Sequence, residues 1–239
     1  IHRHDGFAGD RQVSVDSTAQ IHPSAVIEPG ARIGAGCEIG PFCWIGAHVE
    51  LAENVVCTSH VVIRGQTKVG SDTRIFSFAV IGEIPQDLKF KGEVSQLEIG
   101  QRNTIREHVT INLGTQGGGG VTSIGDDCLL MAGCHIAHDA RLGNRVIIVN
   151  SAAIAGHVVI ENDVIVGGLC GVHQFVRLGK GAIIGAVTMV TNDVIPYGLV
   201  QASRGQLDGL NLVGLKRRGV DRQDITALRA AFQMLAQGE

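Results

Sequence analysis

The sequence predicts an all-β solenoid, a parallel β-helix of hexapeptide repeats with about nine coils and a short α-helical C-terminal tail. An apolar residue recurs at every sixth position over 21–81, 99–111 and 124–190, and the residue four places later is usually small, as at Ala31 and Cys37. A period of six matches neither an α-helix nor simple strand alternation, so it indicates an internal repeat that forms three flat faces. The 33 glycines and the 4% aromatic content agree with narrow corners and a thin core.

The repeat divides the chain into three parts. Residues 1–20 show no hexad and are expected to form an irregular lead-in, 21–198 the β-helix, and 199–239 a helical C-terminal region. Two excursions interrupt the β-helix, near 85–98 and at 116–123. The first leaves the repeat in frame, whereas the second shifts its phase by one residue. Because regular coils form a scaffold, we expect function at the interruptions.

The second excursion contains four consecutive glycines in the segment QGGGGVTS. Such a run could cradle a phosphate, or it could form a flexible corner loop. It lacks the Lys-Ser/Thr end of a nucleotide-binding P-loop, so the sequence leaves both interpretations open.

The tail changes to a helical pattern beyond residue 198. We expect a short helix over 209–218 that ends at Gly219, and a second helix capped by Asp221 with Ile225 on its apolar face. The tail also carries the densest positive charge, in LKRRG. This charge is either a solvated helix end or an anion site, and the sequence alone does not decide between them.

Composition limits the partners and the compartment. A net charge of −3 without long charged runs argues against nucleic acid as a partner. No stretch has transmembrane length or the form of a signal peptide, so no stable membrane insertion is expected. Six cysteines occupy inward repeat positions: Cys37, Cys43, Cys57, Cys128, Cys134 and Cys170. Free packing thiols fit a reducing compartment, and we expect a cytoplasmic location.

Four histidines fall within one short stretch of the repeat: His135, His138, His157 and His173. His138 and His157 occupy corner positions nineteen residues apart, which places them almost one above the other on adjacent coils. His173 follows at nearly the same edge of the next coil. One corner histidine is usually a solvated side chain, but several on one ridge indicate a site.

Two kinds of chemistry use such a cluster. Neutral imidazoles can hold zinc, or one histidine can act as a general base that a carboxylate orients. Asp139 follows His138 directly and could serve as that carboxylate. Since no three of the histidines have a strong zinc-ligand spacing, we expect catalysis and no metal.

Besides the repeats, the chain carries a QDLKF loop and further motifs in this order: GTQGGGG, LLMAGCHIAHDARLGN, AGHVVI, GGLCGVHQF and GLNLVGLKRRG. Together they resemble the UDP-N-acetylglucosamine O-acyltransferases of lipid A biosynthesis over about residues 21–236. The resemblance implies a left-handed β-helix, although crossovers are usually right-handed, and a homotrimer. The family's tail is longer than the helices expected here, so we expect the C-terminal region to be incomplete.

The resemblance also implies the reaction. An acyltransferase of this family moves a (R)-3-hydroxyacyl group from acyl carrier protein to the glucosamine 3-hydroxyl of UDP-N-acetylglucosamine, the first step of lipid A biosynthesis. His138 matches the general base, Asp139 the carboxylate that orients it, and Gly156 the backbone N–H that receives the oxyanion. The reaction needs no cofactor.

Substrate contacts are implied position by position. Sugar and phosphate contacts match Asp87 and Lys89, hydroxyl and donor contacts match His135 and His157, and a nucleotide-side contact matches Gln174. The uridine diphosphate would be held by Asn211, Arg217 and Arg218. The family's site lies between adjacent subunits, so the QDLKF loop is expected to serve a neighbour's site. The sequence does not identify the residues that dock the carrier protein; Arg177, Lys180 and Arg222 are candidates.

The chain departs from the family pattern in three places. It reads NLGT from Asn112 where many relatives have His-Arg before the glycine, and Val213 replaces a common Glu. Ala186 stands where relatives that take longer acyl chains have Gly, so its methyl group is expected to shorten the preferred chain.

Three alternatives stay open. The sister N-acyltransferase, which acylates the 2-amine of UDP-3-O-acylglucosamine, carries a separate uridine-binding domain before its hexads, and only about twenty residues precede them here. A γ-type carbonic anhydrase would hold zinc between subunits. A non-enzymatic solenoid would show regular polar ladders and no excursions.

Overall fold

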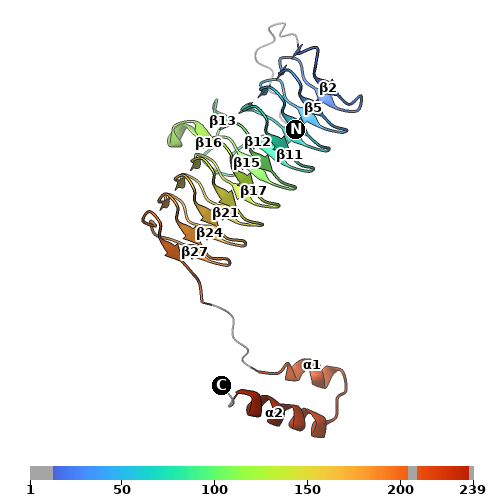
Figure 1. Cartoon of the computed structure of the whole chain (residues 1–239), viewed down its shortest axis with the longest axis vertical. Coiled ribbons are helices and arrows are strands. Elements are labelled where there is room, and N and C mark those ends of the chain that lie inside the picture. The colour runs from blue at the N-terminus through green and yellow to red at the C-terminus, as the bar shows by residue number, and fades with distance from the viewer. Residues whose placement is uncertain (1–12, 204–208, 237–239) are drawn as a thin grey trace. The chain divides into compact units, whose positions relative to one another are not determined.

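The computed structural model describes residues 13–203 and 209–236. The chain separates into two compact units, Ile1–Ala202 and Ser203–Glu239. The first unit is a three-sided parallel β-helix, in which short strands from successive coils stack into three sheets (Figure 1).

Each complete coil contributes one strand to each sheet, and β28 is an additional strand at the end of the second sheet. The first sheet contains β1 (Ser14–Val15), β4 (Arg32–Ile33), β7 (Glu50–Leu51), β10 (Gln66–Val69), β13 (Gln96–Ile99), β16 (Val121–Ile124), β19 (Arg141–Leu142), β22 (Val159–Ile160) and β25 (Arg177–Leu178). The second contains β2 (Gln20–Ile21), β5 (Glu38–Ile39), β8 (Val56–Cys57), β11 (Arg74–Ile75), β14 (Thr104–Ile105), β17 (Leu129–Leu130), β20 (Ile147–Ile148), β23 (Ile165–Val166), β26 (Ile183–Ile184) and β28 (Leu199–Val200). The third contains β3 (Val26–Ile27), β6 (Trp44–Ile45), β9 (Val62–Ile63), β12 (Val80–Glu83), β15 (Thr110–Asn112), β18 (His135–Ile136), β21 (Ala153–Ile154), β24 (Gly171–Val172) and β27 (Met189–Val190).

The register between coils is eighteen residues, as between Ile33 and Leu51. Across the first excursion Val69 pairs with Ile99, 30 residues away, which is twelve more than in a regular coil. Across the second, Ile99 pairs with Ile124, 25 residues away, seven more than in a regular coil. Twelve is a multiple of six and seven is not, which explains why only the second excursion shifts the phase. Both excursions lie at the same corner, where the third sheet passes into the first.

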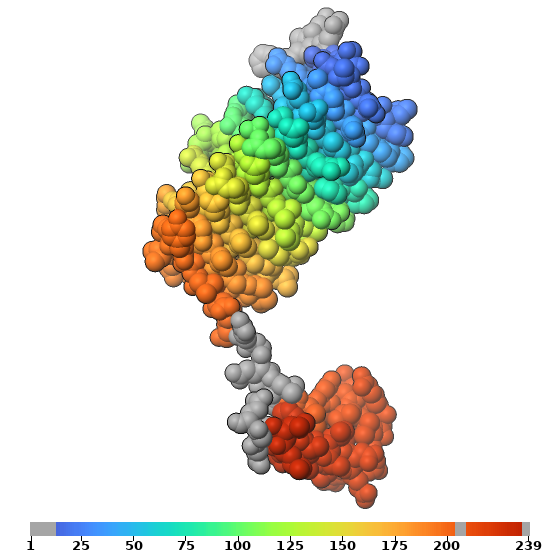
Figure 2. Space-filling model, viewed as in Figure 1, coloured from blue at the N-terminus to red at the C-terminus, as the bar shows by residue number. Residues whose placement is uncertain are grey.

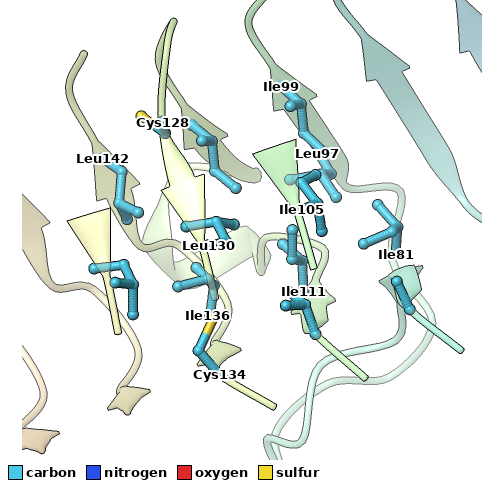
Figure 3. Close-up of a cluster of buried hydrophobic side chains, with 14 of the residues drawn as sticks. Ile81, Leu97, Ile99, Ile105, Ile111, Cys128, Leu130, Cys134, Ile136 and Leu142 are labelled. Carbon is cyan, nitrogen blue, oxygen red and sulfur yellow. The ribbon is translucent and has the colours of Figure 1, made fainter. Parts of the chain in front are cut away.

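The core consists of the apolar repeat residues, which point into the interior from all three sheets. Figure 3 shows one section, in which Ile105, Ile111, Leu130 and Ile136 are fully buried. Cysteines fill several of the small inward positions, and all six are buried and free, as the sequence predicts. Successive coils lie against one another along the β-helix, so each buries its apolar residues against its neighbours (Figure 2).

The β-helix extends slightly beyond the predicted limits at both ends. Strand β1 (Ser14–Val15) lies within the expected irregular lead-in and pairs with β4, because Val15 already occupies the repeat position six residues before Ile21. Strand β28 (Leu199–Val200) pairs with β26 beyond residue 198. Residues 1–12 of the lead-in lie outside the described residues.

The second unit contains α1 (Leu212–Arg217) and α2 (Arg222–Ala236). The first helix starts later than expected because Asn211 is its N-cap, with Oδ1 accepting a hydrogen bond from Gly214 N at 2.8 Å. Gly219 follows it with a φ of 71°. Asp221 Oδ1 accepts from Gln223 N at 2.7 Å and so caps the start of α2. Neither described helix has the length and apolar character that a membrane crossing requires.

The two excursions stack on each other at their shared corner. The second contains the 3₁₀ helix η1 (Gln116–Gly118). Gln96 N donates to Gly120 O at 2.8 Å, and Gly114 N donates to Gln96 O at 3.2 Å. At their base, Asn112 Nδ2 donates to Ile84 O at 3.1 Å. The NLGT departure therefore joins the two excursions through a side-chain amide.

Candidate active site

The corner below the excursions brings the predicted catalytic residues together in two columns. His138, Gly156 and Gln174 occupy the second place after the repeat residue in three successive coils, and Asp139 and His157 occupy the third place. Both third-place residues have left-handed backbone, with φ of 60° at Asp139 and 63° at His157. The eighteen-residue register therefore stacks these side chains coil upon coil.

His138 and Asp139 form a buried hydrogen-bonded pair. His138 Nδ1 lies 2.8 Å from Asp139 Oδ2, and the two side chains are 8% and 1% exposed. An ionised carboxylate only accepts hydrogen bonds, so Nδ1 carries the proton and Nε2 is left to accept one. The sequence predicted a corner position outside the core, but the histidine is nevertheless buried. The arrangement suits a general base.

The glycine run of the second excursion packs on the carboxylate of Asp139. Thr115, which precedes η1, donates from N to Oδ1 at 2.8 Å and from Oγ1 to Oδ2 at 2.6 Å. A Cβ on Gly118 would lie 2.0 Å from Asp139 Cγ, so a glycine is needed there. The run therefore packs as a corner loop against Asp139, while Thr115 just before it supplies the hydrogen bonds to the carboxylate.

Gly156 makes room for the imidazole. A Cβ at this residue would lie 2.6 Å from His138 Cε1 and 2.7 Å from Nε2. Within the described part of the chain the Gly156 N–H has no hydrogen-bond acceptor. Pro23 and Pro29 occupy the same repeat position in earlier corners. Because proline has no N–H, the hydrogen bonds between coils do not require a donor at this position. A free amide donor therefore lies beside the histidine.

His157 lies over both members of the pair. Its ring centroid is 5.0 Å from that of His138 with the planes at 85°, and its Nδ1 lies 3.7 Å from Asp139 Oδ2. On its other side the ring stacks on Phe175 at 4.4 Å with an angle of 2°. The stack fixes the plane of the imidazole.

His135 projects from β18, three residues before His138 in the same coil. Thr110 Oγ1 and His135 Nδ1 are 2.8 Å apart. Burial lowers the pKa of His135 below its usual value, and the nearby His138 adds to the effect. This histidine is therefore poised to be a neutral hydrogen-bonding group.

A groove of about 390 Å³ passes in front of His135, His138 and His173. It is lined by Gln86, His135, Ala137, His138, Ala153, Ile154, Ala155, Gly156, Gly171, Val172, His173, Gln174 and Met189. Its floor is the outer face of the third sheet, where His135, Ala153, Gly171 and Met189 follow one another in register. The small residues in the middle form a trough, and Met189 lies across Gly171 at its far end.

A larger hollow of about 920 Å³ lies on the first sheet in the earlier coils. Its lining includes Arg32, Glu50, Lys68 and Glu98. Arg32 and Glu50 pair at 3.7 Å, so the charges follow one another with alternating sign. The hollow contains none of the clustered histidines, and the trough is the better candidate for a reaction.

Several predicted residues lie away from the groove within this chain. Asp87 and Lys89 form a local turn in the first excursion, with Lys89 N donating to Asp87 Oδ1 at 2.9 Å, and neither lines the groove. Ala186 lies at the corner between β26 and β27 and is not among the residues that line the groove. The residues assigned to the nucleotide, Asn211, Arg217 and Arg218, belong to the second unit.

His138, Asp139 and His157 also have the donor types of a metal site, since their ligand atoms lie within 4.8 Å of one another. However, both oxygens of Asp139 already accept hydrogen bonds from Thr115, and one also faces His138. A metal ion would have to displace this arrangement. The geometry therefore favours the hydrogen-bonded pair.

Sequence reasoning missed Thr115, Gln86 and Met189. Thr115 stands four places after Ile111, where the repeat predicts only a small inward residue, and its contact with Asp139 depends on the path of the excursion. Gln86 is the first residue of the QDLKF loop, in which only Asp87 and Lys89 were assigned a role. Met189 could have been found, because it occupies the outward place of the third sheet two coils after Ala153.

Known families match the chain in separate segments. A model described as UDP N-acetylglucosamine O-acyltransferase, domain 2, matches residues 193–239. The bacterial transferase hexapeptide model matches 13–47, 24–59 and 122–156.

Three known proteins are similar over most of the chain. An acyl-[acyl-carrier-protein]–UDP-N-acetylglucosamine O-acyltransferase from Paracoccus denitrificans is 70% identical over 164 residues, covering 69% of this chain and 63% of the relative. One from Agrobacterium fabrum is 45% identical over 175 residues, covering 73% and 65%. The alignments span slightly less than two thirds of these two relatives. The solved UDP-N-acetylglucosamine acyltransferase from Campylobacter jejuni is 42% identical with a TM-score of 0.74, covering 90% of this chain and 83% of that one.

These likenesses confirm the fold class that the sequence predicts. The chain is a left-handed parallel β-helix of hexapeptide repeats with a short helical C-terminal part.

Proposed function

The chain belongs to the UDP-N-acetylglucosamine O-acyltransferase family, and from this premise we propose that it acylates the glucosamine 3-hydroxyl of UDP-N-acetylglucosamine. The acyl group is a (R)-3-hydroxyacyl chain carried by acyl carrier protein, and the reaction begins lipid A biosynthesis. The observation that carries the proposal is the buried His138–Asp139 pair, with 2.8 Å between Nδ1 and Oδ2, at the edge of an apolar trough.

His138 acts as the general base. Its Nε2 takes the proton from the sugar hydroxyl while that oxygen attacks the thioester carbonyl. The Asp139 carboxylate holds the Nδ1 proton and stabilises the imidazolium that forms. When the carbon–sulfur bond breaks, the imidazolium returns its proton to the leaving thiolate, so the base is restored. A positioned base of this kind contributes roughly 10²–10⁴-fold to the rate.

The Gly156 N–H stabilises the oxyanion. The thioester carbonyl oxygen gains negative charge as the sugar oxygen attacks, and a preorganised amide donor lowers the energy of that state. The absence of a competing acceptor among the described residues and the closeness of Gly156 to the His138 ring support this role. One donor of this kind is typically worth about 3 kcal/mol.

The trough receives the acyl chain. Ala153 and Gly171 leave its middle open and apolar, and Met189 limits its far end. His135, His157 and Gln174 provide polar contacts at the end where the sugar and the thioester meet. Ala186, at the adjoining corner, shortens the preferred chain.

The remaining contacts involve the second unit and a second copy of the chain. Asn211, Arg217 and Arg218 hold the uridine diphosphate, for which a fork of guanidinium donors is well suited. We also propose a homotrimer, in which Asp87 and Lys89 serve a neighbour's site. The exposed apolar residues of the same excursion, Ile84, Leu88 and Val94, fit such an interface.

Arg177, Lys180 and Arg222 are the basic residues proposed for docking the acyl carrier protein. The proposed location is the cytoplasm, where the six buried thiols stay reduced. No metal or cofactor takes part in the proposed chemistry.

The test is acyl transfer from (R)-3-hydroxyacyl carrier protein to UDP-N-acetylglucosamine by the wild type, His138→Ala and the control His22→Ala. We expect His138→Ala to lose at least about 10²-fold in kcat while retaining nucleotide affinity, because only the base is removed. His22 lies in the first coil and should be dispensable. Dialysis against a chelator should leave the wild-type rate unchanged. Full activity of His138→Ala would refute the mechanism, and loss of activity on chelation would favour a metal site.

A further inference from the structure

The carboxylate of Asp139 is enclosed by the second excursion. Thr115 donates to Oδ1 through its N–H at 2.8 Å and to Oδ2 through its hydroxyl at 2.6 Å. The backbone of Gly118 lies directly against the carboxylate, which leaves no space for a methyl group. One residue thus binds both oxygens of the acid next to the proposed base.

Thr115 is itself held in place. It is 6% exposed and has extended backbone, with φ of −123° and ψ of 155°. Its carbonyl oxygen accepts hydrogen bonds from Gly118 N at 3.0 Å and Gly120 N at 2.8 Å. The exit strand of the same excursion adds a further contact, because Thr122 Oγ1 accepts from Asp139 N at 2.8 Å. Both the side chain and the backbone of Asp139 are therefore fixed by this excursion.

We propose that Thr115 is a positioning residue for catalysis, which acts through Asp139 on His138. The proposal rests on the proposed function, since it takes His138 as the base. Oδ2 receives the Thr115 hydroxyl and faces the His138 Nδ1 proton, while Oδ1 receives the Thr115 N–H. With its oxygens occupied in this way, the carboxylate cannot rotate away from the imidazole, and the imidazole keeps Nε2 towards the groove.

This role explains the second excursion. A regular hexad has no hydrogen-bond donor that reaches the corner of the next coil. The seven residues that the second excursion adds allow Thr115 to lie over Asp139 in that corner. Burying a carboxylate is costly unless donors compensate for the lost water. Thr115 provides two such donors in a place where the repeat provides none.

The first test compares Thr115→Val with Thr115→Ser in the whole protein. Valine keeps the shape and the N–H but removes the hydroxyl, so we expect kcat to fall about tenfold with little change in KM for the nucleotide sugar. Serine keeps both donors and should restore kcat to within about twofold of the wild type. A kcat for Thr115→Val equal to that of the wild type would overturn the proposal.

Two neighbouring glycines give a second, independent test. Gly118→Ala places a methyl group against the Asp139 carboxylate, whereas a Cβ at Gly117 meets nothing within 4 Å. Both residues lie in η1, so the two variants change helix propensity alike. We expect Gly118→Ala to lower kcat and Gly117→Ala to leave it unchanged. Equal rates for both variants would count against the enclosed carboxylate as a determinant of activity.

A double-mutant cycle separates positioning from general stability. If Thr115 acts through Asp139, Thr115→Val should change the single-turnover rate less than about twofold when Asp139→Asn is already present. The same tenfold loss in both backgrounds would show that Thr115 acts otherwise. His138→Ala, measured in the same assay, distinguishes the failure of the Thr115 proposal from the failure of the proposed function. If that variant is inactive while Thr115→Val is normal, only the present inference falls, and if it is fully active, the proposed function falls.

Discussion

Asp139, His157 and Phe175 occupy the same corner place in three successive coils, and each has left-handed backbone with φ between 60° and 66°. A non-glycine residue in this conformation costs roughly 1–2 kcal/mol, so the coil imposes a conformation that these residues do not prefer. Because the three residues have nearly the same φ, their side chains leave the corner in the same direction. The stacked rings of His157 and Phe175 and the contact of His157 with Asp139 follow from that repetition.

His135 makes stability depend on pH. Burial lowers its pKa below the ordinary value of 6.5, so below that value the unfolded chain binds the proton more readily than the folded chain. Its contribution to stability is present above pH 6.5 and is lost as the pH falls. We expect His135→Gln, measured by urea unfolding, to lose less stability than the wild type between about pH 7 and about pH 5. The exposed His22→Gln should behave like the wild type, and identical slopes for all three proteins would contradict the argument.

At the scale of elements, the acyl trough is a product of sheet register. Its floor residues, Ala153, Gly171 and Met189, stand one coil apart on neighbouring strands, so each coil adds about 4.8 Å of floor. Acyl length should therefore be set where a larger side chain interrupts the column.

Replacing the residues at the far end should lengthen the preferred acyl chain. We expect Met189→Ala and Ala186→Gly each to shift the optimum towards longer substrates, by a few methylenes at most, because removing side-chain volume extends the trough. The measurement is kcat/KM with acyl carrier proteins of graded chain length. Val62→Ala, which changes the outer face of the same sheet in an early coil, is the matched control. An unchanged optimum in both test variants would remove these residues from chain selection.

The hexad frame allowed the fold and part of the site to be predicted. It placed His138 and His157 on adjacent coils, because eighteen residues always return the chain to the same corner. It gave no access to Thr115 or Gln86, since neither excursion has a period and their contacts arise only after folding. The burial of His138 was missed for the same reason, because the excursion covers a corner that the repeat would leave exposed.

At the scale of the whole molecule, stability is built from coil-to-coil contacts around a continuous core. The pKa values of the buried thiols reflect how completely this core excludes water. Burial raises the pKa of Cys128 to about 11 and that of Cys134 to about 12, so both stay protonated at pH values where the thiols of an unfolded chain ionise.

The alkaline side of the stability profile should therefore slope downwards. Above about pH 9 the unfolded chain releases thiol protons that the folded chain keeps, which lowers the unfolding free energy by about 1.4 kcal/mol per pH unit for each such thiol. The loss continues until the pKa values of about 11 and about 12 are reached. A Cys128→Ala/Cys134→Ala variant should show a shallower decline in denaturant titrations, although its stability at neutral pH is lower. Rapid labelling of the thiols in the folded protein at pH 8 would contradict this prediction, because it would show that Cys128 and Cys134 are accessible to solvent.

The eighteen-residue register also governs how such a protein can change in length during evolution. Losing or gaining one hexad between the second excursion and His138 would carry every later strand to the neighbouring face, and His138 would then stand on a different edge from the excursion that covers its partner. The segment between Thr115 and His138 is therefore fixed in length, whereas coils ahead of the second excursion or beyond the site can be added or lost without separating these residues.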